Sequence, residues 1–156
     1  MANITVIIGP PCAGKSTYIQ SKAATGDVLI DYDAIAKAIG NKSSHNATGS
    51  IRDIALSMRW RAIYSITEGI EDDAWIIHTA PNESLIKEYA EAGAVFQILD
   101  PGIEACIERA KQDERPEETI EVIQQWYEGK ERLLSWIDAH VSIKMISTLR
   151  GIIDSL

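Results

Sequence analysis

A glycine-rich loop with one lysine occupies residues 9–17, which read GPPCAGKST. Gly9, Gly14, Lys15 and Ser16 match the fixed positions of the pattern G-x-x-x-x-G-K-[ST]. In such a loop the backbone N–H groups turn toward a phosphate, the lysine reaches the β- and γ-phosphates, and the hydroxyl ligates Mg²⁺. We therefore predict that the loop binds ATP together with Mg²⁺. The residues predicted to surround the nucleotide are Gly9, Pro10, Pro11, Cys12, Ala13, Gly14, Lys15, Ser16 and Thr17.

Two carboxylates follow the second apolar run of the chain. Asp31 and Asp33 flank Tyr32 after residues 27–30, and side chains two positions apart in an extended chain point the same way. We predict that Asp31, together with Ser16, serves Mg²⁺. Asp33 is predicted to be a general base, which accepts the proton of an attacking hydroxyl. Asp33 could also cap the helix that follows, and the two roles are compatible.

A cation-rich stretch, ERAKQDER at residues 108–115, precedes Pro116. A segment of this kind could close over the nucleotide, and its arginines would then stabilise the charge on the phosphoryl group in transit. Arg109 and Arg115 are accordingly predicted to be catalytic lid residues. Lys111 is expected on a solvated helix face.

The other polar candidates carry less specific signals. His78, at the end of the third apolar run, could contact phosphate or substrate, or could be a hydrogen-bonded histidine at a strand end. It also stands where a mechanical ATPase would place a metal-binding aspartate, which favours a kinase over hydrolysis. His45 and His140 are expected to be incidental. Three arginines of the long helix could meet an anionic substrate, although a solvated face is the expected position of each, namely Arg52, Arg59 and Arg61.

The elements that must position these residues follow from the hydrophobic pattern. The predicted strands are residues 3–9, 27–30, 75–79 and 94–100, and the predicted helices are residues 17–24, 34–39, 51–69, 83–92, 102–114 and 117–140. The tail, residues 142–156, is predicted to be a helix, with a fifth strand at 141–146 as the alternative. The polar segment 40–50 is expected to be a lid, a substrate clamp or a plain surface loop.

Strands that alternate with helices predict an α/β fold. The expected architecture is a three-layer P-loop NTPase fold, in which helices cover both faces of a parallel sheet of four or five strands. Ligands of such sheets bind beyond the carboxyl ends of the strands. That edge would gather the phosphate loop, Asp31, Asp33, His78 and Asp100. A chain of 156 residues fits one domain, residues 1–156.

The long helix and the tryptophans give the expected core. Apolar residues at helical spacing predict a buried stripe that comprises Ile51, Ile54, Ala55, Met58, Ala62 and Ile66. The four tryptophans are expected to serve packing, namely Trp60, Trp75, Trp126 and Trp136.

The composition narrows the class of protein. The net charge of −8 does not attract nucleic acid as a bulk field, although a local basic groove could still do so. Cys12 and Cys106 are too few for a disulfide framework. Neither a signal peptide nor a membrane-spanning run is visible, so we expect a cytoplasmic location and no membrane partner. The oligomeric state is left open.

The chain also resembles a known family. GPPCAGKSTYI, DYD, TAPN, ILDPGIEACIERA and ERPEETIEVIQQWYE occur in the order and spacing of the kinase domain of bacteriophage polynucleotide kinase and related small phage P-loop kinases, over residues 3–130. The resemblance implies Lys15 and Ser16 as phosphate and magnesium residues, Asp33 as the base, and Arg109 and Arg115 as lid arginines.

The resemblance further implies ATP-dependent transfer of the γ-phosphate to a hydroxyl of a nucleic acid or nucleotide, as at a polynucleotide 5′ end. A phage-encoded protein would act in the host cytoplasm. DYD also looks like the D-x-D of shikimate and gluconate kinases, which leaves a small-metabolite or nucleoside kinase open. A phage kinase of hydroxymethylated DNA bases is a third possibility. An alternative outside the kinases is an NTPase or a regulatory module that binds nucleotide but has no phosphoryl acceptor.

Overall fold

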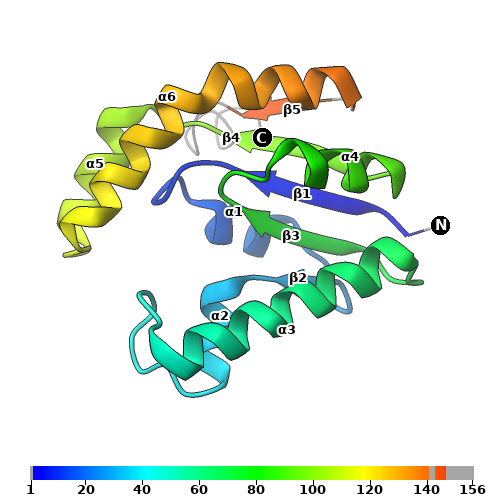
Figure 1. The fold of residues 1–156 in the computed structure, drawn as a ribbon, viewed down its shortest axis with the longest axis horizontal. Helices are drawn as coiled ribbons and strands as arrows, with labels where there is room; N and C mark the ends of the chain where they lie inside the picture. The colour runs from blue at the N-terminus through cyan, green and yellow to red at the C-terminus, as the bar shows by residue number, and fades with distance from the viewer. Residues whose placement is uncertain (1, 141–142, 147–156) are drawn as a thin grey trace.

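The computed structural model describes residues 2–140 and 143–146 of the chain. Its centre is a five-stranded sheet in the order β2-β3-β1-β4-β5, in which every neighbouring pair is parallel (Figure 1). The strands are β1 (Ile4–Ile8), β2 (Val28–Ile30), β3 (Ala74–His78), β4 (Val95–Leu99) and β5 (Ile143–Ile146). Because all the strands run the same way, their carboxyl ends share one edge of the sheet.

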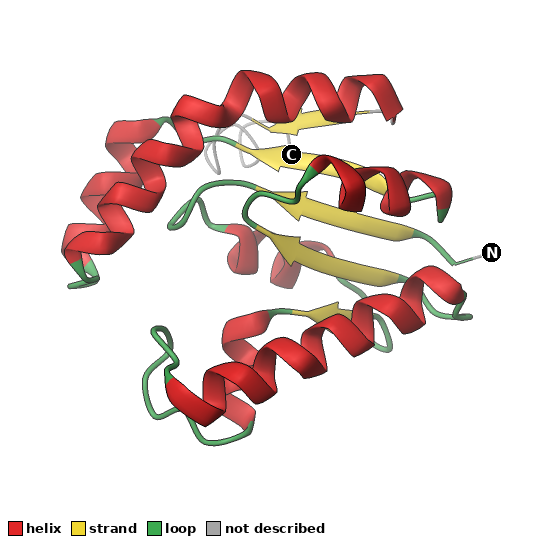
Figure 2. Cartoon of the chain, in the orientation of Figure 1, coloured by secondary structure: helices red, strands yellow, loops and turns green. Residues whose placement is uncertain are grey.

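Helices cover both faces of this sheet (Figure 2). They are α1 (Lys15–Lys22), α2 (Tyr32–Ala38), α3 (Gly49–Glu68), α4 (Glu83–Glu91), α5 (Ile103–Gln112) and α6 (Glu117–His140). Val6 and Ile8 of β1 pack in one core with residues of α3, α4 and α6, whereas Ile7 packs in a second core with residues of α1 and α5. The alternation along β1 therefore feeds both cores, and the expected three-layer α/β architecture is confirmed.

The predicted elements match these bounds to within a few residues except in the tail. Residues 143–146 form β5 beside β4, with Ile143 opposite Phe96, so the helix predicted there is wrong and the alternative strand is right. Pairing with β5 covers an edge of β4 that would otherwise carry unpaired backbone groups. The rest of the predicted tail helix lies outside the described residues.

The buried face of α3 also differs from the prediction. The helix buries Ala55 and Ile66 as expected, but it exposes Ile54 and Met58 and buries Arg59. A charged side chain is expected on the solvent side of an amphipathic helix, but Arg59 lies on the buried side of α3. Trp60 is 47% exposed and so lies outside the core, although its ring packs edge-on against His78 with the ring centroids 6.3 Å apart.

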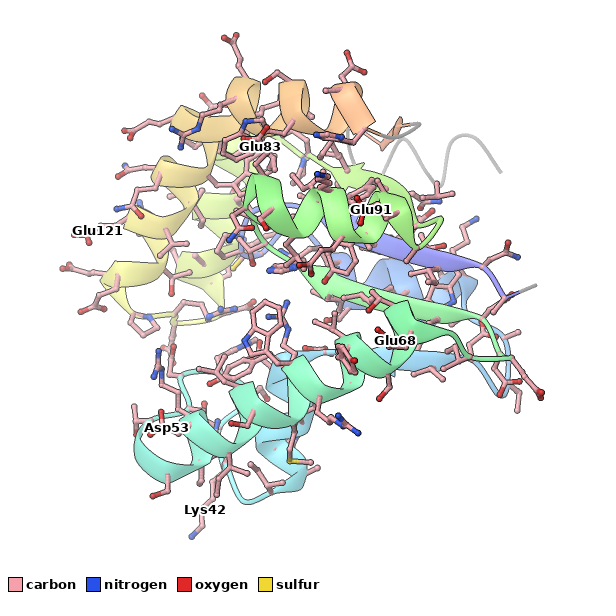
Figure 3. The ribbon with its side chains drawn as sticks, turned by 45° about the vertical axis from the view of Figure 1, so that its right-hand side comes forward. Lys42, Asp53, Glu68, Glu83, Glu91 and Glu121 are labelled. Atoms are coloured by element: carbon pink, nitrogen blue, oxygen red, sulfur yellow. The ribbon has the colours of Figure 1, made fainter. Side chains whose placement is uncertain are left out.

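The surface carries the acidic residues behind the charge of −8. Glu68, Glu83, Glu91 and Glu121, which are labelled in Figure 3, are exposed. Among the described residues, no helix combines the length and the apolar character needed to cross a bilayer.

Candidate active site

The loop between β1 and α1 has the backbone shape that its sequence predicts. Gly14 caps α1 with φ at 89°, and Cys12 also has a positive φ, of 63°. At Gly9 a side chain would collide with the fold, because an added Cβ would lie 2.5 Å from the carbonyl oxygen of Leu99. The first turn of α1 thus directs its unpaired N–H groups into the loop.

Lys15 is buried at the centre of this loop. Its Nζ donates to the carbonyl oxygens of Gly9 at 2.6 Å and of Pro10 at 2.7 Å. Burial lowers the pKa of Lys15 to about 8. An incoming phosphate would favour the charged form of this lysine, since an opposite charge at short range offsets the cost of burial.

A pocket of about 670 Å³ opens at the carboxyl edge of the sheet. The phosphate loop, from Pro11 to Thr17, forms one wall. Further lining comes from the residues after β2, the middle of α3 and the end of β3, and it includes Asp31, Asp33, Arg59 and His78. The fold therefore brings the predicted phosphate, metal and base residues to one cavity.

Asp31 makes the contacts of a helix cap and of a metal-side carboxylate. Its Oδ1 accepts from the backbone N–H of Asp33 at 3.0 Å, and its Oδ2 accepts from the hydroxyl of Ser16 at 3.2 Å. The cap of α2 is thus Asp31, and the alternative that Asp33 caps this helix is wrong.

These two side chains fit a magnesium ion shared with a nucleotide. Within the described residues, no three His, Cys, Asp or Glu side chains are grouped so that they could hold a metal ion by themselves. Mg²⁺ is commonly held by one or two protein ligands, waters and substrate phosphates. Ser16 and Asp31 supply such a pair, and phosphate oxygens would have to complete the coordination.

Asp33 lies in the first turn of α2 with its carboxylate directed at the polar loop that precedes α3. Nδ1 of His45 lies 3.1 Å from its Oδ2, and Nε2 of His45 lies 3.2 Å from Nη1 of Arg115. Arg115 can only donate, so Nε2 accepts and Nδ1 carries the proton that is donated to Asp33. His45, expected to be incidental, thus joins the predicted base to a predicted lid arginine.

The two predicted lid arginines make different contacts. Nη1 of Arg109 donates to the carbonyl oxygen of Cys12 at 3.2 Å, so this side chain braces the phosphate loop from behind. Arg115 lines the pocket and also donates to Sγ of Cys12 at 3.6 Å. Burial raises the pKa of the Cys12 thiol. Arg115, the second choice from sequence, is therefore the better placed of the two to meet a bound phosphate.

His78 ends β3 beside Arg59 and lines the pocket. Its Nδ1 lies 3.4 Å from the hydroxyl of Tyr89. Burial, reinforced by the charges of Arg59 and Lys15, lowers the pKa of His78 to about 3, so the ring is neutral. The structure thus gives His78 the contact of a strand-end histidine and a place in the pocket wall as well.

Asp100, at the end of β4, serves the fold rather than the pocket. Its carboxylate accepts from Tyr127 at 2.6 Å, from the backbone of Gly102 at 3.1 Å, and from Lys130. Burial alone would raise the pKa of Asp100, but the hydrogen bonds from Lys130 and Tyr127 hold it below its ordinary value. This carboxylate joins β4 to α6.

Several solved structures resemble this chain in fold. No protein-family model and no curated protein matches the chain. A chain of the Pnkp1/Rnl/Hen1 RNA repair complex matches with a TM-score of 0.63 and 16% identity, over 84% of this chain and 46% of that one. Shikimate kinase from Acinetobacter baumannii, in complex with shikimate, gives 0.59 and 16%, over 95% and 84%. Deoxyadenosine kinase from M. mycoides with bound dATP gives 0.53 and 14%, over 97% of each chain.

The chain has the fold of the P-loop kinases. The predicted fold class is confirmed by these matches, which extend over most of the chain. The chain spans less than half the length of the RNA repair protein that it matches. At 14–16% identity the likeness concerns the fold, so any chemistry must be argued from the pocket itself.

Proposed function

We propose that this protein is an ATP-dependent kinase that transfers the γ-phosphate to a hydroxyl, most simply of a nucleic acid or nucleotide. The observation that carries the proposal is the pair of carboxylates, Asp31 and Asp33, that lines one pocket together with the phosphate loop. Asp31 contacts Ser16 on the metal side, whereas Asp33 faces the cavity with no such contact to the loop. Transfer to an alcohol uses a positioned base for the attacking hydroxyl, and Asp33 is in place to supply it.

The chain's own residues supply each part of such a reaction. Lys15 and the loop amides would hold the β- and γ-phosphates, and Mg²⁺ between Ser16 and Asp31 would neutralise phosphate charge. Asp33 would take the proton of the acceptor hydroxyl while the oxygen of that hydroxyl bonds to the γ-phosphorus. The bond to the bridging oxygen of the β-phosphate breaks at the same time, and ADP leaves. Arg115 would stabilise the charge on the transferring group.

Two neighbours in fold show how the acceptor could differ. Shikimate kinase and deoxyadenosine kinase share this architecture with a chain from an RNA repair complex. A small-metabolite or nucleoside kinase therefore remains the competing assignment, with a hydroxymethylated DNA base as a further acceptor. We expect the protein to act in the cytoplasm, where ATP is available.

A transfer screen tests the proposal. The protein is incubated with γ-labelled ATP and Mg²⁺ and with DNA 5′ ends, RNA 5′ ends, hydroxymethylated DNA, nucleosides, nucleotides or hydroxy acids. We expect label on one of the nucleic acid or nucleotide acceptors, and a loss on the order of 10²- to 10⁴-fold for Asp33→Asn. ATP affinity of that variant should be preserved in calorimetry.

The matched control is Asp53→Asn, which removes an exposed carboxylate at the start of α3 (Figure 3). This variant should transfer phosphate at the wild-type rate. ATP consumption that needs no added hydroxyl compound would contradict the proposal and would favour an NTPase or regulatory module. Label found only on a nucleoside or a hydroxy acid would leave a kinase but assign it to the competing class.

A further inference from the structure

Arg59 is a buried cation without a counter-charge. It lies on the inner side of α3, is 8% exposed, and lines the pocket. Its Nη2 donates to the carbonyl oxygen of Ile77 at 3.1 Å. Its Nε is buried and has no hydrogen-bond partner among residues 2–140 and 143–146. A guanidinium has five N–H donors in a fixed fork, and leaving a buried one unpaired is strongly unfavourable.

The protein does not neutralise this charge. No carboxylate of the described chain forms an ion pair with Arg59. Asp31 exerts a favourable field on it, but the oxygens of Asp31 are already engaged by Ser16 and by the backbone N–H of Asp33. The neighbouring His78 is a neutral ring, which adds a polar wall without any negative charge. A buried, unpaired arginine that lines a cavity has the donor set of an anion site.

Arg59 lines the same pocket as the predicted base, Asp33. Its helix, α3, packs on α2, which carries Asp33, through Ala36 and Ala55. The phosphate loop, which the proposed function assigns to the nucleotide, lines the same pocket, but Arg59 makes its hydrogen bond to Ile77 and not to that loop. An anion at Arg59 would therefore be part of the acceptor rather than of ATP.

We propose that Arg59 binds an acidic group, a phosphate or a carboxylate, on the acceptor itself. The preferred acceptor then carries a hydroxyl for transfer and a separate anionic group for recognition. This inference rests on the proposed kinase function, and it excludes neutral nucleosides and neutral alcohols as the best substrates. The guanidinium of Arg59 suits a planar carboxylate or a tetrahedral phosphate, because two of its N–H groups can donate to two oxygens of such a group at once.

Paired acceptors that differ only in the acidic group test this. Thymidine 3′-monophosphate is compared with thymidine, and shikimate with its methyl ester, so that the phosphate and carboxylate sources are distinguished. We expect the wild type to favour one acidic member in kcat/KM. In Arg59→Met that preference should fall by about 10- to 100-fold, the usual worth of charged hydrogen bonds. A folding defect would lower both members of a pair alike and leave the ratio unchanged.

Two further variants complete the design. Arg59→Lys keeps the charge without the fork and should retain part of the preference. Arg61→Met removes an exposed arginine of the same helix and should keep the wild-type ratio. A wild-type ratio in Arg59→Met, or an equal loss in Arg61→Met, would overturn the inference.

Binding without ATP separates this inference from the proposed function. Calorimetry with thymidine 3′-monophosphate and with shikimate should show binding of one of them to the wild type and weaker binding to Arg59→Met. That result, in a protein that transfers no phosphate, would support the anion site and refute the kinase. Transfer with a ratio that does not depend on Arg59 would support the kinase and refute the anion site.

Discussion

Nδ1 of His45 lies 3.1 Å from Oδ2 of Asp33, so an imidazole from the polar loop orients the predicted base. The donated proton occupies one carboxylate oxygen and leaves the other free to receive the proton of the acceptor. Because Nε2 of the same ring contacts Arg115, the loop also joins the base to the arginine that would meet ATP. We infer that His45 is a positioning residue that couples Asp33 to Arg115.

Substitution of His45 tests this coupling. His45→Ala removes both contacts and should lower kcat about 10-fold, the worth of a hydrogen bond to a charged group. His45→Asn places an amide N–H near the position of Nδ1, so it should keep Asp33 oriented and lose less. Steady-state kinetics with the acceptor found in the screen gives both values. His140→Ala, at the exposed end of α6, is the control, and wild-type turnover in His45→Ala would refute the coupling.

The parts of the site that lie in one contiguous stretch could be predicted from sequence. Gly9, Gly14, Lys15 and Ser16 each have one local task, namely a close approach, a turn, a phosphate contact and a metal ligand, so the motif predicts the loop. Asp31 and Asp33 were found because they follow a strand whose end must lie at the ligand edge of the sheet.

His45 and Arg59 could not be assigned in this way. His45 contacts Asp33 across 12 residues of sequence, and the loop that carries His45 has no helical or strand periodicity from which the contact could be predicted. Arg59 lies on the buried side of α3, four residues after Ala55 and four before Ile63, but its charge led to the expectation of a solvated position. A charge on the inner side breaks that rule, and functional sites are where such departures concentrate. The helix prediction for residues 143–146 was wrong for a different reason, because the spacing of Ile143 and Ile146 fits a helix and a short strand equally well.

The buried Lys15 predicts a proton linked to nucleotide binding. Burial lowers its pKa to about 8, and the phosphates of ATP would raise that pKa again because they favour the charged form. Binding at pH 8 should therefore take up about half a proton per ATP, whereas at pH 6.5 the lysine is already charged and should take up almost none. Calorimetry in two buffers of different ionisation enthalpy measures the uptake.

The matched variant for this measurement is Lys22→Met, at the exposed end of α1, which should keep the same uptake. Lys15→Met should abolish high-affinity binding, since it removes the one cation at the centre of the loop. Binding enthalpies at pH 8 that do not depend on the buffer would show that Lys15 is charged before ATP arrives.

Asp31→Asn should raise the Mg²⁺ concentration needed for half-maximal transfer. The variant loses the negative charge beside Ser16 but keeps an acceptor for the N–H of Asp33, and asparagine is as good a helix cap as aspartate. The fold of α2 should therefore persist while metal affinity falls. A Mg²⁺ titration at saturating ATP measures the change. An unaltered titration in Asp31→Asn would exclude this carboxylate from the metal site.

Two glycines offer opposite effects on stability. An alanine at Gly9 would place its Cβ 2.5 Å from the carbonyl oxygen of Leu99, a backbone atom that cannot move aside. Gly9→Ala should lower the free energy of unfolding by about 1–3 kcal/mol. Gly129 lies inside α6 with open space around it, so Gly129→Ala should raise that free energy by about 0.5–1 kcal/mol. Urea unfolding measures both, and equal effects would refute the close contact at Gly9.

The two lid arginines should differ in kinetics because their contacts differ. Arg115 reaches into the pocket, so Arg115→Ala should lower kcat on the order of 10²-fold with little change in KM for ATP. Arg109 holds the carbonyl of Cys12, so Arg109→Ala should loosen the phosphate loop and mainly raise KM for ATP. Lys111→Ala, an exposed cation between them, is the control for charge. If Arg109→Ala shows the larger loss of kcat, Arg109 moves to the transferring phosphate during closure, and the contacts described here belong to a different step.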